Sequence, residues 1–178
     1  MTKQAGGMTK QELRQLIRQR KREHAADAPV DMPLDARVLS ASTILLYNAL
    51  PDEVQTLSLI DRLTACGKTV LLPRVVSATD MELRRYTGRH DLQPGAFGIM
   101  EPTGEVFHDY DAIDVAVIPG VAFDVEGHRL GRGRGYYDRL LPRLTHAYLL
   151  GVCLSWQLVD SVPCESHDAV VHDVLSLP

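Results

Sequence analysis

The sequence predicts an α/β fold: a single domain with three layers, α/β/α, around a mostly parallel central sheet. Residues 43–72 have the pattern of a strand, a helix and a second strand, and such a βαβ unit implies parallel strands. Two more strand-like apolar runs follow, at residues 115–118 and 147–154. The length of 178 residues suits one domain, since domains usually have about 100–200 residues.

The composition favours a cytoplasmic protein that folds without a covalent staple. We expect residues 1–8 to be a disordered lead and residues 9–178 to form the domain. The lead has no apolar segment of the kind found in signal peptides, and no apolar run approaches the length of a membrane span. The three cysteines show no C-x-x-C spacing, which favours reduced thiols over bridges or a zinc site.

A basic helix is predicted at the start of the domain, from about residue 9 to residue 25. Thr9 and Glu12 have the spacing of a capping box, and Leu13 and Ile17 follow at helical spacing. This segment contains six bases and two acids. Its polar face should therefore be strongly cationic.

The βαβ unit is predicted from its apolar runs and its turn residues. Residues 43–47 are a short apolar run typical of a buried strand. Asp52 is expected to cap the following helix, and Gly67 stands where a helix-ending glycine should stand. Residues 68–72 form the second predicted strand, which we expect Pro73 to stop.

The remaining elements are predicted from shorter patterns. Residues 92–105 are rich in glycine and proline and predict a loop. The other predicted elements are a strand at 81–86, a buried strand at 115–118, a helix from about 135 to 141, a strand at 147–154 and an edge strand at 170–175.

The charge is unevenly distributed along the chain. The net charge is −4, yet residues 129–143 hold five arginines and a single acid, and the predicted first helix is also basic. Nucleic-acid binders usually have a domain that is basic as a whole. An acidic chain with two basic segments suits a small anionic ligand better than a long polyanion.

The most informative segment is residues 119–139, which leave a buried strand and enter a helix. Ligands bind at this position in open α/β sheets. Glycines at 131, 133 and 135 alternate with Arg132 and Arg134. Glycine lets backbone N–H groups approach a phosphate, and arginine adds cationic donors. The spacing matches neither the P-loop nor the dinucleotide-binding pattern, so the segment predicts an anion site, with a flexible surface loop as the alternative.

This segment closely resembles the signature of the 5-formyltetrahydrofolate cyclo-ligase family, also called 5,10-methenyltetrahydrofolate synthetases. Shorter pieces resemble the family in the right order over nearly the whole chain: Lys10–Arg14, Asp52-Glu53, Leu72-Pro73-Arg74, Gly98–Pro102, Gln157–Pro163 and His167-Asp168. The resemblance implies that ATP and Mg²⁺ are used to convert 5-formyltetrahydrofolate to 5,10-methenyltetrahydrofolate. It also implies that the formyl oxygen is phosphorylated and that ADP and phosphate are released. One departure is His172 followed by Asp173, where many members have an acid in a different pattern.

The resemblance also implies roles for particular residues. The implied ATP site comprises Lys10, Arg14, Arg129, Leu130, Gly131, Arg132, Gly133, Arg134, Gly135, Tyr136 and Tyr137. The implied folate site comprises Glu53, Arg132, Gly133, Arg134, Gly135 and Tyr136, with Asn48, Phe123 and Trp156 as weaker candidates. Arg132 and Arg134 are the implied catalytic residues, and Asp138 and Asp168 are the implied Mg²⁺ ligands. Glu53 is expected in the first turn of a helix, where it would bind the pterin edge.

Structural alternatives exist for several of these residues. Lys10 and Arg14 could belong to a solvated helix face, Asp138 could be a first-turn acid, and one tyrosine of the pair at 136 and 137 could pack into the core. Two other functions stay open: a nucleic-acid-binding module with the tyrosines as stacking residues, and a sugar-phosphate isomerase or transferase. We expect small-molecule substrates, no nucleic-acid or membrane partner, and a monomer or weak homo-oligomer.

Overall fold

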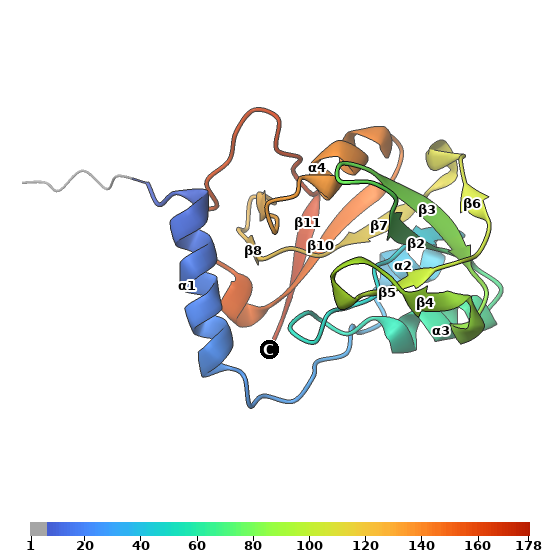
Figure 1. The fold of residues 1–178 in the computed structure, drawn as a ribbon, viewed down its shortest axis with the longest axis horizontal. Coiled ribbons are helices and arrows are strands. Elements are labelled where there is room, and N and C mark those ends of the chain that lie inside the picture. Colours follow the sequence, from blue (N-terminus) through green and yellow to red (C-terminus); the bar gives the residue numbers. More distant parts are fainter. Residues whose placement is uncertain (1–6) are drawn as a thin grey trace, which may run out of the picture.

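The computed structural model describes residues 7–178 and contains a seven-stranded sheet with helices on both faces (Figure 1). The strand order is β11-β10-β7-β1-β2-β3-β6. The strands from β11 to β2 are parallel, and β3 runs antiparallel to both of its neighbours. The bounds of these strands are β1 Thr43–Leu45, β2 Thr69–Val75, β3 Met81–Tyr86, β6 Val106–Phe107, β7 Val115–Ile118, β10 Tyr148–Leu154 and β11 Asp173–Leu177.

Successive residues of the central strands point to opposite faces of the sheet, and each face carries its own core. Ile44 packs in the cluster that includes residues of α2 (Ala36–Ser40) and α3 (Leu57–Ala65). Its neighbour Leu45 packs in the opposite cluster with Leu140 of α4 (Tyr136–Leu140) and the 3₁₀ turn that follows it. Such continuous burial is typical of parallel strands covered on both faces. The predicted α/β fold with a mostly parallel sheet is confirmed.

Helix α1 (Lys10–Glu23) lies outside the sheet, at the end where the parallel strands finish (Figure 1). Leu13 and Ile17 pack on the two-stranded hairpin of β8 (Ala122–Phe123) and β9 (Arg129–Leu130), which follows β7. The predicted capping box is present, because the Thr9 side chain accepts from the Glu12 N–H and the Glu12 carboxylate accepts from the Thr9 N–H. The basic helix is thereby brought to the carboxyl edge of the sheet.

The prediction that a helix begins at Asp52 is wrong, because α3 begins at Leu57. The segment before it is held by contacts with distant residues: Gln55 N–H donates to the Val30 carbonyl, and the buried Thr56 hydroxyl donates to the Tyr47 carbonyl. Asp52 and Glu53 therefore lie in a turn after β1 rather than in a helix.

The prediction that Pro73 stops the second strand is also wrong, since β2 continues to Val75. Strand β1 ends at Leu45, which lies opposite Leu71, so Pro73 has no partner on that side that would need its missing N–H. On the other side Pro73 lies opposite Leu83 of β3. Proline is tolerated here for the same reason that it is tolerated at sheet edges.

Three further predictions change in detail. The predicted loop at 92–105 contains a short hairpin of β4 (Leu92–Pro94) and β5 (Met100–Pro102). The predicted edge strand is present, but it begins at Asp173 and pairs with β10. Most of the predicted lead lies outside the described residues. None of the helices within residues 7–178 is long and apolar enough to cross a membrane.

A buried carboxylate holds the β8–β9 hairpin against the segment after β10. Asp124 is 1% exposed and accepts hydrogen bonds from the N–H groups of Glu126, His128 and Val162 at 3.1, 3.0 and 2.9 Å. Burial alone would raise the pKa of Asp124, but the hydrogen bonds from Val162 and His128 outweigh it and lower that pKa. The ionised form is therefore the one that the fold stabilises.

We predict that Asp124→Asn lowers the free energy of unfolding by about 1–3 kcal/mol, because an amide NH₂ would face a backbone N–H. Urea denaturation checks this, with the exposed Asp109→Asn as a control that should stay within about 0.5 kcal/mol. Because the pKa of Asp124 is lower in the folded state than in the unfolded state, where it is about 3.9, the ionised carboxylate stabilises the fold at a pH above that unfolded-state pKa. This stabilisation is lost as the pH falls through the pKa of the folded state. This role would be contradicted if the free energy of unfolding fell with decreasing pH as steeply in the variant as in the parent.

Candidate active site

A cavity of about 450 Å³ lies at the carboxyl ends of β1, β2 and β7. From β1 the chain first builds the sheet toward β2 and later, from β7, toward β10, so the strand order reverses between β1 and β7. Open α/β sheets bind ligands at this switch point, outside the carboxyl ends of the strands. Tyr47 and Asn48 line the cavity after β1, and Pro119 and Gly120 line it after β7.

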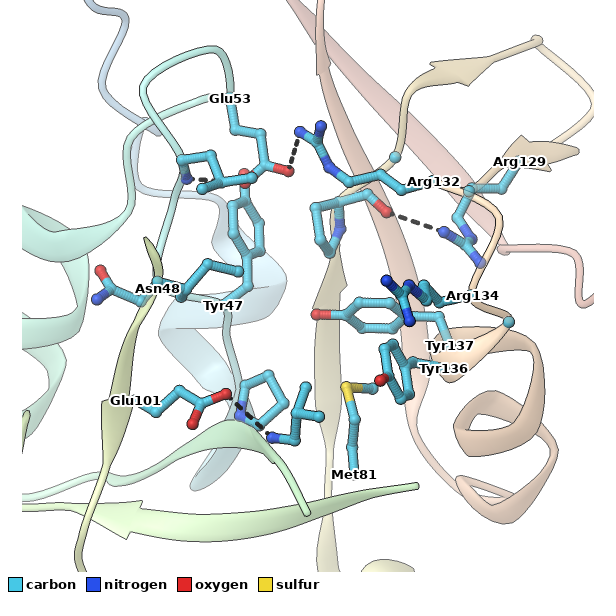
Figure 2. A pocket seen from close by; sticks show the side chains of 18 of the residues that line it. Tyr47, Asn48, Glu53, Met81, Glu101, Arg129, Arg132, Arg134, Tyr136 and Tyr137 are labelled. Atoms are coloured by element: carbon cyan, nitrogen blue, oxygen red, sulfur yellow. Dashed lines mark hydrogen bonds and ion pairs between the residues drawn. The ribbon is translucent and has the colours of Figure 1, made fainter. Parts of the chain in front are cut away.

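The two walls of the cavity differ in chemistry (Figure 2). One wall is the glycine–arginine loop and the start of α4. The other wall is largely apolar and comes from the ends of β2 and β3 and from the β4–β5 hairpin: Pro73, Val75, Met81, Ile99 and Met100. A ligand with an apolar ring system and anionic groups would match both walls.

Arg132 joins the loop to the turn that follows β1. Its guanidinium donates to Glu53 Oε1 at 3.0 Å and to Asp52 Oδ2 at 3.5 Å (Figure 2). The other Glu53 oxygen accepts from the Leu50 N–H at 2.9 Å. Lys21 of α1 also pairs with Asp52, at 2.9 Å. Burial opposes the shift, but Lys21 and Arg132 together lower the pKa of Asp52.

Arg129, an expected ATP contact, is buried instead of extended into the solvent. Its Nη1 donates to the Pro119 carbonyl at 3.3 Å, and its Nη2 donates to Asp138 Oδ1 at 3.2 Å. The guanidinium also lies over the ring of Tyr137, 5.3 Å from its centre. The group lines the cavity, yet its main contacts hold the end of β7 and the first turn of α4 together.

The glycines of the loop serve its backbone geometry. Gly133 and Gly135 have φ values of +103° and +69°, which side chains rarely adopt. Gly135 directly precedes α4, so the loop turns sharply into the helix. The Nε of Arg14 donates to the Gly131 carbonyl at 3.0 Å and ties α1 to this loop.

The two tyrosines after the loop take different positions. Tyr136 is half-buried and donates its hydroxyl to the Ser77 carbonyl at 3.1 Å. The Tyr137 hydroxyl has no hydrogen bond to the described residues and points into the cavity (Figure 2). Burial, with the Glu53 charge, raises the pKa of Tyr137, so its hydroxyl stays protonated and can donate.

The expected metal ligands lie beside cations, and neither of them lines the main cavity. Asp138 Oδ1 pairs with Arg129, and Asp168 Oδ2 accepts from Lys10 Nζ at 2.6 Å. Lys10 also contacts Glu165, at 3.0 Å. Burial opposes the shift, but the Lys10 hydrogen bond lowers the pKa of Asp168. The Lys10 ammonium therefore lies beside the carboxylates and not in the main cavity.

Of the remaining expected site residues, only one lines the main cavity. Phe123 is fully buried in the core cluster beneath the sheet, so its expected place in the folate pocket is wrong. The Leu130 side chain is also buried and packs against α1. Asn48 lines the cavity, where its amide donates to the Met100 carbonyl at 3.0 Å. Trp156 lines a second, smaller cavity.

Several residues that line the cavity had no role predicted from the sequence. Glu101 is 7% exposed, and its Oε1 accepts from the Val75 N–H at 3.2 Å. Tyr47 is buried and donates its hydroxyl to the Val54 carbonyl at 2.9 Å. Tyr47 stands at the end of a predicted strand, which was a signal of its position, whereas Glu101 depends on a hairpin that no local pattern predicted.

An open α/β sheet with a ligand-sized cavity at its switch point, walled by cationic donors on one side, defines a small-molecule enzyme of the α/β class. The comparisons with known proteins all point to the same family of enzymes. The chain belongs to the 5-formyltetrahydrofolate cyclo-ligase family, whose model matches residues 7–176. The family places it among the ligases of folate one-carbon metabolism and does not favour the nucleic-acid-binding alternative.

Individual relatives show the same likeness. The 5-formyltetrahydrofolate cyclo-ligase of Escherichia coli K12 is 32% identical over 167 residues, covering 90% of this chain and 92% of the relative. The mouse enzyme of that name is 29% identical over 149 residues, covering 76% and 73%. The NMR structure of the Aquifex aeolicus 5,10-methenyltetrahydrofolate synthetase superposes with a TM-score of 0.69 at 31% identity, covering 95% of this chain and 81% of that chain.

We predict that Tyr137→Phe weakens binding of 5-formyltetrahydrofolate by about three- to tenfold, the value of one hydrogen bond, with little change in stability. The free energy of unfolding should stay within about 0.5 kcal/mol, since the hydroxyl has no hydrogen-bond partner among residues 7–178. Equilibrium titration and urea denaturation measure the two quantities. Tyr110→Phe, away from the cavity, should change neither. A large loss of stability with unchanged affinity would show that Tyr137 serves packing instead.

Proposed function

We propose that the protein uses ATP and Mg²⁺ to cyclise 5-formyltetrahydrofolate to 5,10-methenyltetrahydrofolate, with release of ADP and phosphate. The observation that carries the proposal is the cavity itself, where a glycine–arginine loop faces an apolar wall and the carboxylate of Glu53. The family supports the overall conversion. The loop supports the use of a phosphate donor, because its backbone and its arginines suit a phosphate.

The chemistry explains why a phosphate donor is needed. The oxygen of the N5 formyl group is a poor leaving group. In the proposed reaction this oxygen attacks the γ-phosphorus of ATP, and the bond to ADP breaks. The resulting iminium phosphate is attacked by the N10 nitrogen at its formyl carbon, which closes the ring. Phosphate then leaves with the former formyl oxygen, N10 gives up its proton, and the methenyl bridge remains.

The cationic wall would bind and stabilise the phosphates. Catalysis of phosphoryl transfer consists mostly of positioning and charge stabilisation. Arg132 and Arg134 extend from the loop at the cavity, and both line it. Arg14 holds the loop from behind through the Gly131 carbonyl. Lys10 would contact the phosphates once its present partners, Glu165 and Asp168, bind another group.

The opposite side of the cavity would bind the pterin. Glu53 is 9% exposed at its side chain, and its carboxylate faces the cavity, where it can accept from the amide and amine of a pterin edge. The apolar side chains of Met81 and Ile99 offer a surface for the rings. The Tyr137 hydroxyl would donate a further hydrogen bond.

The residues near the loop fit a magnesium ion by the chemistry of their donors. Asp138 Oδ2 and Asp168 Oδ1 accept no hydrogen bond from the described residues. Carboxylate oxygens are the ligands that Mg²⁺ uses together with phosphate oxygens and water. When bound, the ion would neutralise charge on the transferring phosphoryl group. Arg129 and Lys10 hold the two carboxylates in place through their other oxygens.

A spectrophotometric assay tests the proposal. With 5-formyltetrahydrofolate, ATP and Mg²⁺, the methenyl product should accumulate, and one ADP should form for each product molecule. Arg132→Ala should depress turnover by about 10²-fold or more, because it removes charge stabilisation from the transfer. Product formation at full rate without ATP would overturn the proposal.

We predict that Glu53→Gln weakens folate binding by about ten- to a hundredfold, or about 1–3 kcal/mol, because an NH₂ donor would face a pterin donor. ATP binding should change much less. The matched control is Glu82→Gln, which also removes a carboxylate–arginine pair, that of Glu82 with Arg84 at 2.6 Å, but lies on β3 outside the cavity. Direct titration of each ligand measures this. Lost ATP binding with intact folate binding would move Glu53 to the nucleotide side.

A further inference from the structure

A short turn, residues 76–80, connects two parts of the apolar wall of the main cavity. It joins Val75 at the end of β2 to Met81 at the start of β3, and both of these residues line the cavity. The turn is held together internally, because the Asp80 carboxylate accepts hydrogen bonds from two hydroxyls of the turn, at 2.9 and 2.6 Å. The position of this compact turn therefore affects the position of the wall on both of its sides.

Two side chains of α4 bind the carbonyls of this turn. The Tyr136 hydroxyl donates to the Ser77 carbonyl at 3.1 Å, and Arg139 Nε donates to the Thr79 carbonyl at 2.5 Å. The Arg139 guanidinium also lies over the ring of Tyr136, 5.6 Å from its centre. The turn between β2 and β3 is thus attached to the start of α4 (Figure 1).

Arg139 makes a second contact, with the glycine–arginine loop. Its Nη2 donates to the Arg134 carbonyl at 2.8 Å. Gly135 leaves room for this contact, since a Cβ at that position would lie 2.8 Å from Arg139 Nη1. Arg134 lines the main cavity, whereas Arg139 is exposed and does not line it. One guanidinium therefore holds a part of each wall from outside the cavity.

These contacts suit a closure that opens to admit substrate. Water can take the place of either partner in an exposed hydrogen bond, so such a bond breaks and re-forms at little net cost. The two contacts of Arg139 are made by different nitrogen atoms, Nε and Nη2. A planar guanidinium can bind two carbonyls at once in this way, which a lysine ammonium cannot reproduce.

We propose that Arg139 is a positioning residue that keeps water out of the main cavity during the reaction, by holding the turn at 76–80 against the glycine–arginine loop. The proposal rests on the proposed function, in which the iminium phosphate must react with N10 and not with water. If the oxygen of a water molecule adds to the formyl carbon, phosphate leaves with the former formyl oxygen. The two water protons pass to phosphate and solvent, and 5-formyltetrahydrofolate is re-formed. One ATP is then consumed without product, so a closed cavity improves the coupling of the reaction.

The amount of ADP formed for each methenyl product measures this coupling. The ratio should be close to one in the parent, and Arg139→Met, which removes both contacts, should raise it about twofold or more. Arg139→Lys keeps the charge but has a single nitrogen, so it should raise the ratio as well. Arg143→Met is the matched control, because Arg143 is an exposed arginine of the same segment that lies over Tyr110 and does not line the cavity. Its ratio should equal that of the parent.

NMR relaxation tests the contact without any catalysis. In the protein without ligands, the backbone order parameters of residues 76–80 should fall in Arg139→Met, from about 0.85 for rigid backbone toward the values below about 0.6 of flexible loops. In Arg143→Met they should match those of the parent. Unchanged order parameters in Arg139→Met would overturn the proposal.

The kinetic outcomes separate this role from two others. A parent-like ratio in Arg139→Lys would show that the charge alone matters, and it would overturn the bridging role. An unchanged ratio in Arg139→Met, with or without a raised KM for ATP, would overturn it too, and a raised KM would place Arg139 on the nucleotide. A parent that forms no methenyl product, while the turn still loses order in Arg139→Met, would overturn the proposed function and leave the contact supported.

Discussion

A charged guanidinium in the protein interior must be paired and hydrogen-bonded, and this requirement at Arg129 shapes the site around it. The group connects the end of β7, through the Pro119 carbonyl, with Asp138 in the first turn of α4, and it lies over Tyr137. Removing one partner of a buried charge is costly, by about 3–5 kcal/mol. The end of β7 and the start of α4 are therefore held in a fixed relative position. The exposed loop between them is anchored at both of its ends.

Lys10 and Arg132 are also paired with carboxylates, but each of these two cations is partly exposed. Lys10 contacts Asp168, and Arg132 contacts Glu53, with the arginine side chain 48% exposed. Ion pairs at exposed sites contribute about 0–1 kcal/mol, and the exposed Arg132 guanidinium belongs with them. An anionic ligand can therefore replace the carboxylate on Arg132 at small cost. The buried pair of Arg129 keeps the scaffold in place, whereas the exposed pairs leave the binding groups available for exchange.

The sequence predicted those features that depend on neighbouring residues, and it failed where distant contacts decide. The capping box at Thr9 and the glycine–arginine loop are local patterns, and both are present. The late start of α3 depends on a hydrogen bond from Gln55 to Val30, which no spacing rule indicates. Phe123 could not be assigned to the core from its short strand, because a two-residue strand shows no period. The hairpin that carries Glu101 was predicted as a loop, because its segment is rich in glycine and proline.

The division of the cavity between two walls follows from the topology of the sheet. The parallel strands β1 and β7 finish at the switch point, and the loops that leave them carry the charged groups. The antiparallel edge supplies the apolar wall, because β3 begins beside the cavity and the β4–β5 hairpin folds over β2. Arg132 stands where these walls meet the basic face of α1, in contact with the turn after β1. Arg132 thus borders both cavities, so any ligand that extends from one cavity into the other must pass this side chain.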